Sequence, residues 1–182
     1  MKLFQTVEDR DNPDYIESNA PFICKAANAW LGEGYYFWDT LIANAHWWGK
    51  VRYRENYVIV EYTCDLLNGK CFDLHGNMEH LKSFNEVIDF LKSQKLVTKT
   101  TTVAKVIEYL KSKAGLASKY DGIRAYGHFS RSNPIFIPFE DSEKSCLELL
   151  PAVQICLFRK KSFNLSAGKI IYPNHYNINY LV

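Results

Sequence analysis

Residues 30–38 read Trp-Leu-Gly-Glu-Gly-Tyr-Tyr-Phe-Trp, and residues 39–48 continue as Asp-Thr-Leu-Ile-Ala-Asn-Ala-His-Trp-Trp. The aromatic run at 35–38 predicts a short strand, because aromatic side chains fit a pleated sheet. Two glycines precede it, and a glycine backbone allows a flat group to approach closely. Asp39 or Thr40 is then positioned to cap a helix that ends at about Trp48. This strand–helix unit indicates both the fold and the candidate site.

Length and composition set the class of protein. The chain has 182 residues, 47% of them hydrophobic and 15% aromatic, with a formal net charge of +2. This favours a single domain over 1–182 with its own core and excludes a largely disordered chain. The small net charge argues against a protein that coats nucleic acid through a broad electrostatic field.

The sequence predicts neither a signal peptide nor a membrane span. No stretch approaches the roughly 18 apolar residues of a membrane span, and the N-terminal residues form no signal-peptide core. The five cysteines are an odd number without a C-x-x-C pair, which agrees with a reducing compartment. We therefore expect a cytoplasmic protein with no membrane partner.

Hydrophobic periodicity predicts the other elements. A short helix opens at Pro13, a second follows the capping-box pattern 83–86, and a third precedes Gly115. Further strands are predicted over 2–7, 57–64, 71–74, 122–126, 134–137, 152–158 and 169–172. Strands, two central helices and strands again indicate a mixed α+β fold rather than regular βαβ alternation.

A turn signal separates the strands predicted at 57–64 and 71–74. Asn68-Gly69 between apolar residues predicts a two-residue hairpin. In that register Cys64 faces Asp73, so Cys64 and Cys71 are not cross-strand partners. A zinc site that also used the histidines at 75 and 80 would need an unusual ligand spacing. Buried free cysteines are the interpretation we favour.

The common catalytic motifs do not fit this sequence. Gly32-Glu33-Gly34 begins like a dinucleotide loop, but Phe37 stands where the third glycine is required. Neither a G-x-S-x-G elbow nor an H-E-x-x-H helix is present. The basic run at 159–161 is short and favours a solvated turn over a nucleic-acid surface.

The segment at 30–48 resembles the ADP-ribosyltransferase superfamily of the diphtheria-toxin and poly(ADP-ribose) polymerase type, and in particular its small bacterial members. In that family the same strand–helix unit holds the nicotinamide of NAD between two aromatic side chains. The resemblance implies that Tyr36 and Trp47 stack on nicotinamide. It also assigns Gly34 and Asn44 to the NAD site.

Two further segments are similar to the same family. Residues 2–6 resemble its first strand, which implies that Gln5 and Thr6 contact NAD. Residues 151–158 resemble its late strand, which implies that Gln154, with Tyr36, is catalytic. The implied fold is α+β, an ADP-ribosyltransferase-like fold with mainly antiparallel split β-sheets and peripheral helices. NAD would be the substrate, and no metal is implied.

The implied chemistry depends on the residue at 154. Transfer breaks the bond between ribose and nicotinamide through an oxocarbenium-like state. The family usually has His or Arg where Gln5 stands, and active members commonly have Glu where Gln154 stands. An amide can hydrogen-bond a ribose hydroxyl but cannot act as a base near neutral pH. Glu143 or Glu148 in the preceding loop could supply a carboxylate.

Two functions follow from the resemblance. The first is a mono-ADP-ribosyltransferase acting on a protein or nucleic-acid acceptor, such as a bacterial toxin or anti-phage effector with an antitoxin as its partner. The second is a catalytically silent relative that binds NAD, a nucleotide or a partner protein through the same cleft.

Overall fold

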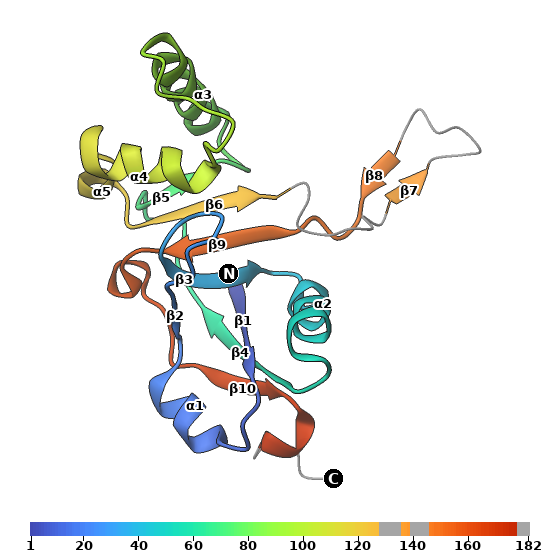
Figure 1. Cartoon of the computed structure of the whole chain (residues 1–182). Coiled ribbons are helices and arrows are strands. Elements are labelled where there is room, and N and C mark those ends of the chain that lie inside the picture. Colours follow the sequence, from blue (N-terminus) through green and yellow to red (C-terminus); the bar gives the residue numbers. More distant parts are fainter. Residues whose placement is uncertain (128–135, 139–145, 178–182) are drawn as a thin grey trace.

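The computed structural model of the chain describes residues 1–127, 136–138 and 146–177. It is a mixed α+β structure whose main sheet has eight strands in the order β10-β4-β1-β3-β9-β6-β5, with β2 paired to β3 (Figure 1). All pairings are antiparallel except β5 with β6. The strands are β1 (Lys2–Glu8), β2 (Ile23–Cys24), β3 (Gly34–Asp39), β4 (Tyr57–Thr63), β5 (Cys71–Asp73), β6 (Gly122–Tyr126), β9 (Val153–Leu157) and β10 (Lys169–Tyr172). A separate ribbon, β7 (Phe136–Pro138) with β8 (Cys146–Glu148), projects from one side (Figure 1).

The sheet is narrowest between β1 and β3. These strands share only two residue pairs, Leu3 with Asp39 and Phe4 with Trp38, whereas β1 pairs with β4 along its whole length. Beyond Phe4 the partners diverge. The mainly antiparallel α+β architecture with peripheral helices is therefore confirmed. The expected split into separate sheets is replaced by one continuous sheet with a narrow junction.

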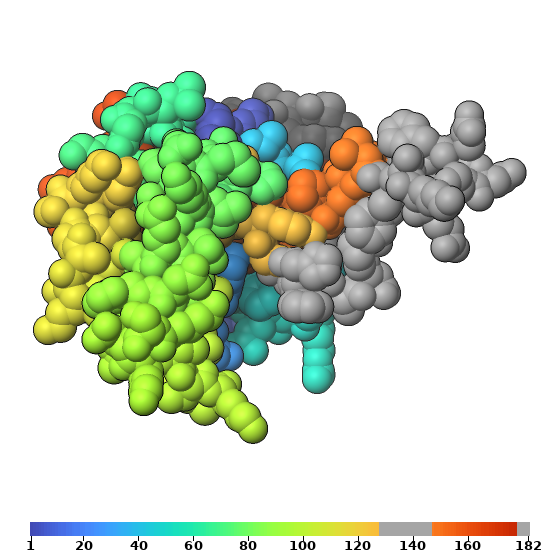
Figure 2. All heavy atoms as spheres, turned by 90° about the horizontal axis from the view of Figure 1, so that it is seen from above, coloured from blue at the N-terminus to red at the C-terminus, as the bar shows by residue number. Residues whose placement is uncertain are grey.

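Helices cover one face of this sheet in two groups. The helix α2 (Ile42–Tyr53) packs on β1, β3 and β4 through a cluster around Phe4, Trp38 and Ala45. Three others, α3 (Met78–Ser93), α4 (Val103–Lys113) and α5 (Leu116–Lys119), pack on β5, β6 and β9. Viewed from above, α3 and α4 lie together on one side of the molecule (Figure 2). The opposite face is covered by α1 (Pro13–Asn19) and by the 3₁₀ turn η1 (Lys160–Phe163). The start of α1 at Pro13 confirms the prediction. A second 3₁₀ turn, η2, spans Asn174–Tyr176.

Both predicted helix caps are wrong. The helix α2 runs from Ile42 to Tyr53 and has no side-chain cap. Asp39 and Thr40 do not cap it because the Thr40 hydroxyl donates to Asp39 and Asp39 pairs with Arg124. The helix α3 begins at Met78, where the Asn77 side chain accepts hydrogen bonds from two backbone N–H groups. The capping-box residues at 83–86 therefore lie inside α3.

The predicted hairpin is also wrong. Both edges of β4 are occupied, by β1 and by β10, so β5 pairs with β6 instead. The turn itself forms: the Asn68 side chain accepts from the Lys70 N–H at 2.9 Å, and Gly69 takes the φ of +75° that glycine tolerates. The Asn68-Gly69 signal thus predicted the turn correctly, but it did not predict that β5 pairs with β6.

The strands at 2–7, 122–126 and 169–172 are confirmed, and the strand at 134–137 falls partly outside the described residues. Cys64, Cys71 and Cys156 are buried free thiols, and burial raises their pKa to about 11, 12 and 12. In the described ranges, no cluster of His, Cys, Asp and Glu could hold a metal ion, and no helix is long and apolar enough to cross a bilayer.

Candidate functional site: an aromatic cavity beside the sheet junction

A cavity of about 500 Å³ opens where β1 and β3 diverge. It lies between the sheet, α2 and the segment 22–30, and Gln5, Thr6, Tyr36, Trp47 and Gln154 all line it. Eight of the eighteen described lining residues are aromatic. The rings come from Phe22, Trp30, Tyr36, Phe37, Trp38, Trp47, Trp48 and Tyr53. The structure thus brings together five of the seven residues that the resemblance assigns to the site.

Gln5 closes the gap between the diverging strands. Its amide donates to the carbonyls of Phe22 (2.9 Å) and Tyr36 (3.3 Å), and its oxygen accepts from the Phe22 N–H at 2.8 Å. The side chain is 5% exposed. Gln5 therefore replaces the missing ladder hydrogen bonds and forms part of the cavity floor. Thr6, the next residue, donates to the Ala45 carbonyl at 2.9 Å and joins β1 to α2.

Tyr36 presents its ring to the cavity while its hydroxyl holds a loop. The hydroxyl donates to the Gly32 carbonyl (2.8 Å) and accepts from the Leu31 N–H (2.9 Å). Burial, and the nearby Cys156 thiol, raise the pKa of Tyr36 far above the ordinary tyrosine value. This hydroxyl stays protonated at neutral pH, so Tyr36 contributes an aromatic surface rather than a proton.

Gln154 is held by a neighbouring indole. Its Oε1 accepts a hydrogen bond from Trp30 Nε1, and both side chains line the cavity. The bond connects β9 to the loop that Tyr36 anchors, which fixes the Trp30 ring on the cavity wall. The Gln154 oxygen is therefore engaged within the protein, although its amide nitrogen is a donor of the kind that a ligand oxygen can accept from.

The helix α2 supplies the opposite wall. The Trp47 ring meets Trp38 edge-on at 5.9 Å and lies 6.1 Å from Trp48. One turn later on the same helix, Arg52 reaches the cavity. Among the described lining residues Arg52 is the only charged one, so the cavity carries a cation and no carboxylate.

The two remaining assigned residues do not line the cavity. A Cβ on Gly34 would lie 2.4 Å from Cys156 Sγ and 2.8 Å from the Leu157 carbonyl oxygen, so this glycine allows β3 and β9 to approach closely. Asn44 is fully buried and donates to the Pro151 carbonyl at 2.9 Å. Both shape the strand–helix unit from outside the cavity.

Of the two carboxylates considered for catalysis, only Glu148 is among the described residues, and it lies away from the cavity wall. Glu148 accepts a hydrogen bond from the Tyr126 hydroxyl and does not line the cavity. This bond, with a smaller contribution from burial, raises the pKa of Tyr126 to about 12. Glu143 lies outside the described residues.

Nothing matches this chain among protein-family models, curated proteins or solved structures. Its geometry therefore carries the functional interpretation. Sequence reasoning missed Trp30, Phe22, Arg52 and Cys24 as cavity residues. For Arg52 a signal existed, because it follows Trp48 by four positions and so shares its helix face. For Phe22 and Cys24 no local signal existed.

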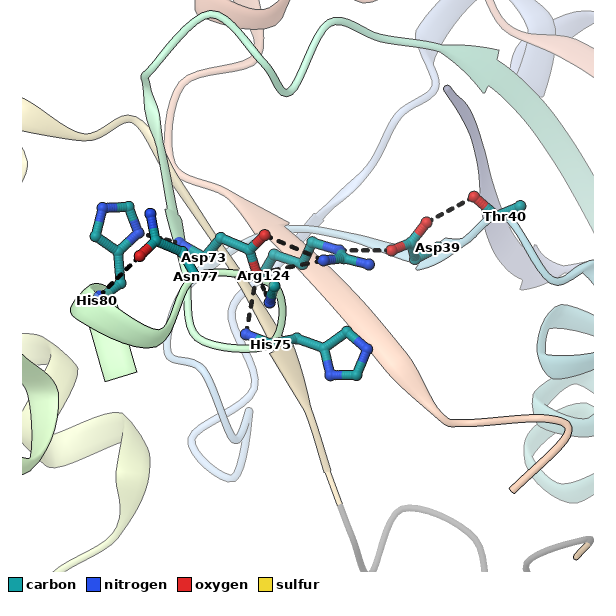
Figure 3. A network of polar contacts seen from close by, with 8 residues as sticks. Asp39, Thr40, Asp73, His75, Asn77, His80 and Arg124 are labelled. Atoms are coloured by element: carbon teal, nitrogen blue, oxygen red, sulfur yellow. Dashed lines mark hydrogen bonds and ion pairs between the residues drawn. The ribbon is translucent and has the colours of Figure 1, made fainter. Parts of the chain in front are cut away.

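A second polar cluster forms around Arg124 (Figure 3). Arg124 pairs with Asp39 at 2.6 Å and with Asp73 at 3.1 Å. Arg124 stands opposite Ile155 in the register, whereas Gln154 is the next residue and faces the other side. The cluster therefore ties β3, β5 and β6 together and contributes nothing to the cavity wall.

Backbone N–H groups complete this cluster. Asp73 accepts from the N–H groups of His75 and Gly76 at 2.9 and 2.8 Å. Burial alone would raise the pKa of Asp73, but these two N–H groups and the Arg124 guanidinium outweigh it and lower the pKa. Asp73 is therefore a carboxylate at neutral pH, and it is a structural one.

Proposed function

We propose that the aromatic cavity binds a nucleotide, with NAD as the first candidate. The observation that carries this proposal is the lining itself: the described residues contribute eight aromatic side chains, one guanidinium and no carboxylate around about 500 Å³. Ligand sites commonly have volumes of about 300–1,000 Å³. Aromatic rings stack on flat heterocycles, and arginine pairs with phosphate through a planar fork of N–H donors.

Each part of the ligand has a suitable partner. Trp30 and Trp47 offer aromatic surface for the base or the nicotinamide ring. Arg52, which is exposed on α2, offers its charge to the pyrophosphate. The amide nitrogen of Gln154 offers a donor to a ribose hydroxyl. Among the described residues of the wall there is no carboxylate to repel an anionic ligand.

ADP-ribosyl transfer from NAD to a protein or nucleic-acid acceptor is the second candidate. It is favoured by the resemblance of residues 34–37 to the ADP-ribosyltransferase superfamily and by the grouping of Gln5, Tyr36, Trp47 and Gln154 around one cavity. An ADP-ribosyltransferase-like fold, a toxin or effector role, an antitoxin partner and a cytoplasmic location belong to this candidate. The geometry supports binding more strongly, because the Gln154 oxygen is engaged by Trp30 and the described lining residues include neither a carboxylate nor a histidine that could act as a base near neutral pH.

The binding proposal is tested by titrating the protein with NAD, ADP-ribose, ATP and nicotinamide while following heat or tryptophan fluorescence. We expect NAD and ADP-ribose to bind, and Arg52→Gln to weaken both by about tenfold. Nicotinamide, which has no phosphate, should bind Arg52→Gln and the unmodified protein alike. Arg54→Gln is the matched control, because Arg54 ends the same helix but does not line the cavity. Failure of every nucleotide to bind at millimolar concentration would contradict the proposal.

Labelled NAD separates the two candidates. Incubation with lysate, protein fractions or nucleic acid should leave no label on any macromolecule if the cavity only binds. Label that appears on an acceptor, and is lost in Gln154→Ala but kept in Gln94→Ala, would instead establish transfer. Gln94 is a suitable control because it is exposed at the end of α3.

A further inference from the structure

Cations from distant parts of the chain meet at one end of the sheet, where β6 begins and β9 ends. We call this group the basic surface; it consists of Lys70, Lys111, Lys119, Arg159, Lys160 and Lys161. Asp121 is at its centre: its N–H donates to the Lys70 carbonyl, and its own carbonyl accepts from the Arg159 N–H. The Arg159 guanidinium reaches the Ala117 carbonyl in α5 at 2.9 Å. These contacts bring together three segments that are far apart in the sequence.

The charges of this surface are mostly uncompensated. Arg159 pairs with the Asp121 carboxylate at 2.8 Å. Across residues 1–127, 136–138 and 146–177, no carboxylate lies within ion-pair distance of the other five cations. Glu33 and Asp65 are exposed in neighbouring loops but make no ion pair with them. The surface is thus locally positive although the whole chain carries only +2.

Aromatic rings lie beneath three of the ammonium groups. Lys111 Nζ is 3.7 Å from the centroid of the Phe158 ring, Lys119 Nζ is 5.1 Å from Tyr120, and Lys160 Nζ is 5.4 Å from Tyr35. A cation–π contact orients a lysine without neutralising its charge. The ammonium groups are therefore held in place and remain available to an anion.

Helix dipoles explain only part of this arrangement. Lys111 and Lys119 lie in the last turns of α4 and α5, where cations stabilise a helix. The run at 159–161 leads into a 3₁₀ turn of only four residues, which is too short to have a substantial dipole. Helix stabilisation alone therefore does not explain why the lysines of α4 and α5 lie near the basic run at 159–161.

We propose that the basic surface binds the backbone of single-stranded nucleic acid. Proteins that bind such strands combine cations with aromatic rings, because the phosphates pair with the cations and the bases stack on the rings. A base that displaces the Lys111 ammonium from Phe158 leaves that ammonium free to reach the adjacent phosphate. An acidic peptide would pair with the same lysines but has no flat ring to place on Phe158 or Tyr35. The binding of nucleic acid here does not depend on which ligand occupies the cavity.

The surface lies next to the loop that separates it from the cavity. Lys111 Nζ would lie 4.0 Å from a Cβ atom added to Gly32, and the Gly32 carbonyl accepts a hydrogen bond from the Tyr36 hydroxyl. The same loop carries Trp30, which lines the cavity. Lys111 lies with α4 on one face of the sheet and Lys160 with η1 on the other. A strand bound across both would therefore pass around the end of the sheet, along the outer side of this loop.

The test is fluorescence anisotropy of the full chain with a labelled oligouridylate of about 20 nucleotides over a range of salt concentrations. We expect binding that weakens as salt rises. The double variant K111Q/K160Q should bind about tenfold less tightly and reduce the salt slope by about 1.4, because each lost phosphate contact on a single strand lowers it by about 0.7. K50Q/K99Q is the matched control, since it removes two exposed charges away from the surface. Phe158→Leu should weaken binding without changing the salt slope, because it removes stacking and keeps every charge.

Competitors identify the class of partner. Polyglutamate of equal charge should displace the oligonucleotide poorly, and vesicles rich in phosphatidylserine should not displace it. Equal competition by either would overturn the proposal in favour of an acidic protein or a membrane. An oligonucleotide that fails to bind at about 50 mM salt, or binds K111Q/K160Q as well as the unmodified chain, would also overturn it. Circular-dichroism melting of each variant confirms that a lost affinity is not a lost fold.

Discussion

Gln5 shows how a residue can occupy a site position and still serve the fold. The resemblance assigns it to NAD, yet its amide bonds the backbone of Phe22 and Tyr36. Tyr36 and Gln154 behave alike: the hydroxyl of one and the oxygen of the other are engaged by the loop at 30–32. At this scale the side chains build the cavity wall with their polar atoms and present their remaining surface to a ligand.

Replacing Gln5 by leucine should therefore reduce stability. The change leaves buried backbone groups of Phe22 and Tyr36 without partners, at a cost of about 2–3 kcal/mol. Urea denaturation measures it, with Gln94→Leu at an exposed position as the control. Unchanged stability together with lost nucleotide binding would instead show that Gln5 grips the ligand.

Cys24 should be the most reactive of the described thiols. It lines the cavity and is only half-buried, whereas the pKa values of Cys64, Cys71 and Cys156 are raised to about 11, 12 and 12 by burial. Brief alkylation of the native protein, followed by peptide mapping, should find the label on Cys24 and not on these three. A bound nucleotide should slow the labelling of Cys24. Equal labelling of all four thiols would show that the core opens on the timescale of the reaction.

The strand–helix unit of β3 and α2 positions the cavity at the scale of elements. The strand places Tyr36 and Trp38 toward the helices, and α2 adds Trp47, Trp48 and Arg52 from the other side. The unit depends on close contact between β3 and β9, which Gly34 allows.

Gly34→Ala should consequently disturb both packing and binding. The added methyl would meet the Leu157 carbonyl oxygen at 2.8 Å, and backbone cannot rotate away as a side chain can. We expect a loss of about 2–3 kcal/mol in the free energy of unfolding. Gly69→Ala is the comparison: that position is open, so the loss there should be about 1 kcal/mol from its positive φ alone. Equal losses at the two glycines would refute the close-contact explanation.

Across the whole molecule, two polar clusters tie strands of the sheet together. Gln5 joins β1 to β3 across the junction at the cavity, and Arg124 joins β3 to β5 and β6 within one half of the sheet, on the opposite face. The carboxylate Asp73 has a pKa that folding lowers. Its contribution to stability is thus present above the unfolded-state pKa of about 3.9 and is lost as the pH falls through the lower folded-state value.

The pH dependence of unfolding checks this linkage. Between about pH 5 and 3 the unmodified protein should lose stability more steeply than Asp73→Asn, which cannot titrate at this position. Asp89→Asn is the control, because Asp89 forms an exposed pair with Lys92 on α3. If the free energy of unfolding falls equally steeply with pH in the unmodified protein and in Asp73→Asn, the ionisation of Asp73 is not linked to folding.

Local patterns in the sequence were sufficient for most elements and for the aromatic segment. The strands at 2–7, 122–126 and 169–172 and the helix at Pro13 follow from periodicity and from the backbone preferences of single residues, which act over a few positions. The resemblance of the segment at 30–48 to a known superfamily singled out Tyr36 and Trp47, which do line one cavity. Local patterns also indicated Asn68-Gly69 as a turn.

Only the tertiary structure decided which strands pair and which polar atoms remain for a ligand. The strand β5 joins β6 because β1 and β10 occupy both edges of β4, and that competition is invisible in a local window. Asp39 pairs with Arg124, 85 residues away, instead of capping a helix. The cations of the basic surface likewise look scattered along the chain and meet only in the fold. Hydrogen bonding and charge depend on distance in space, so the sequence determined which groups exist and folding determined what each one contacts.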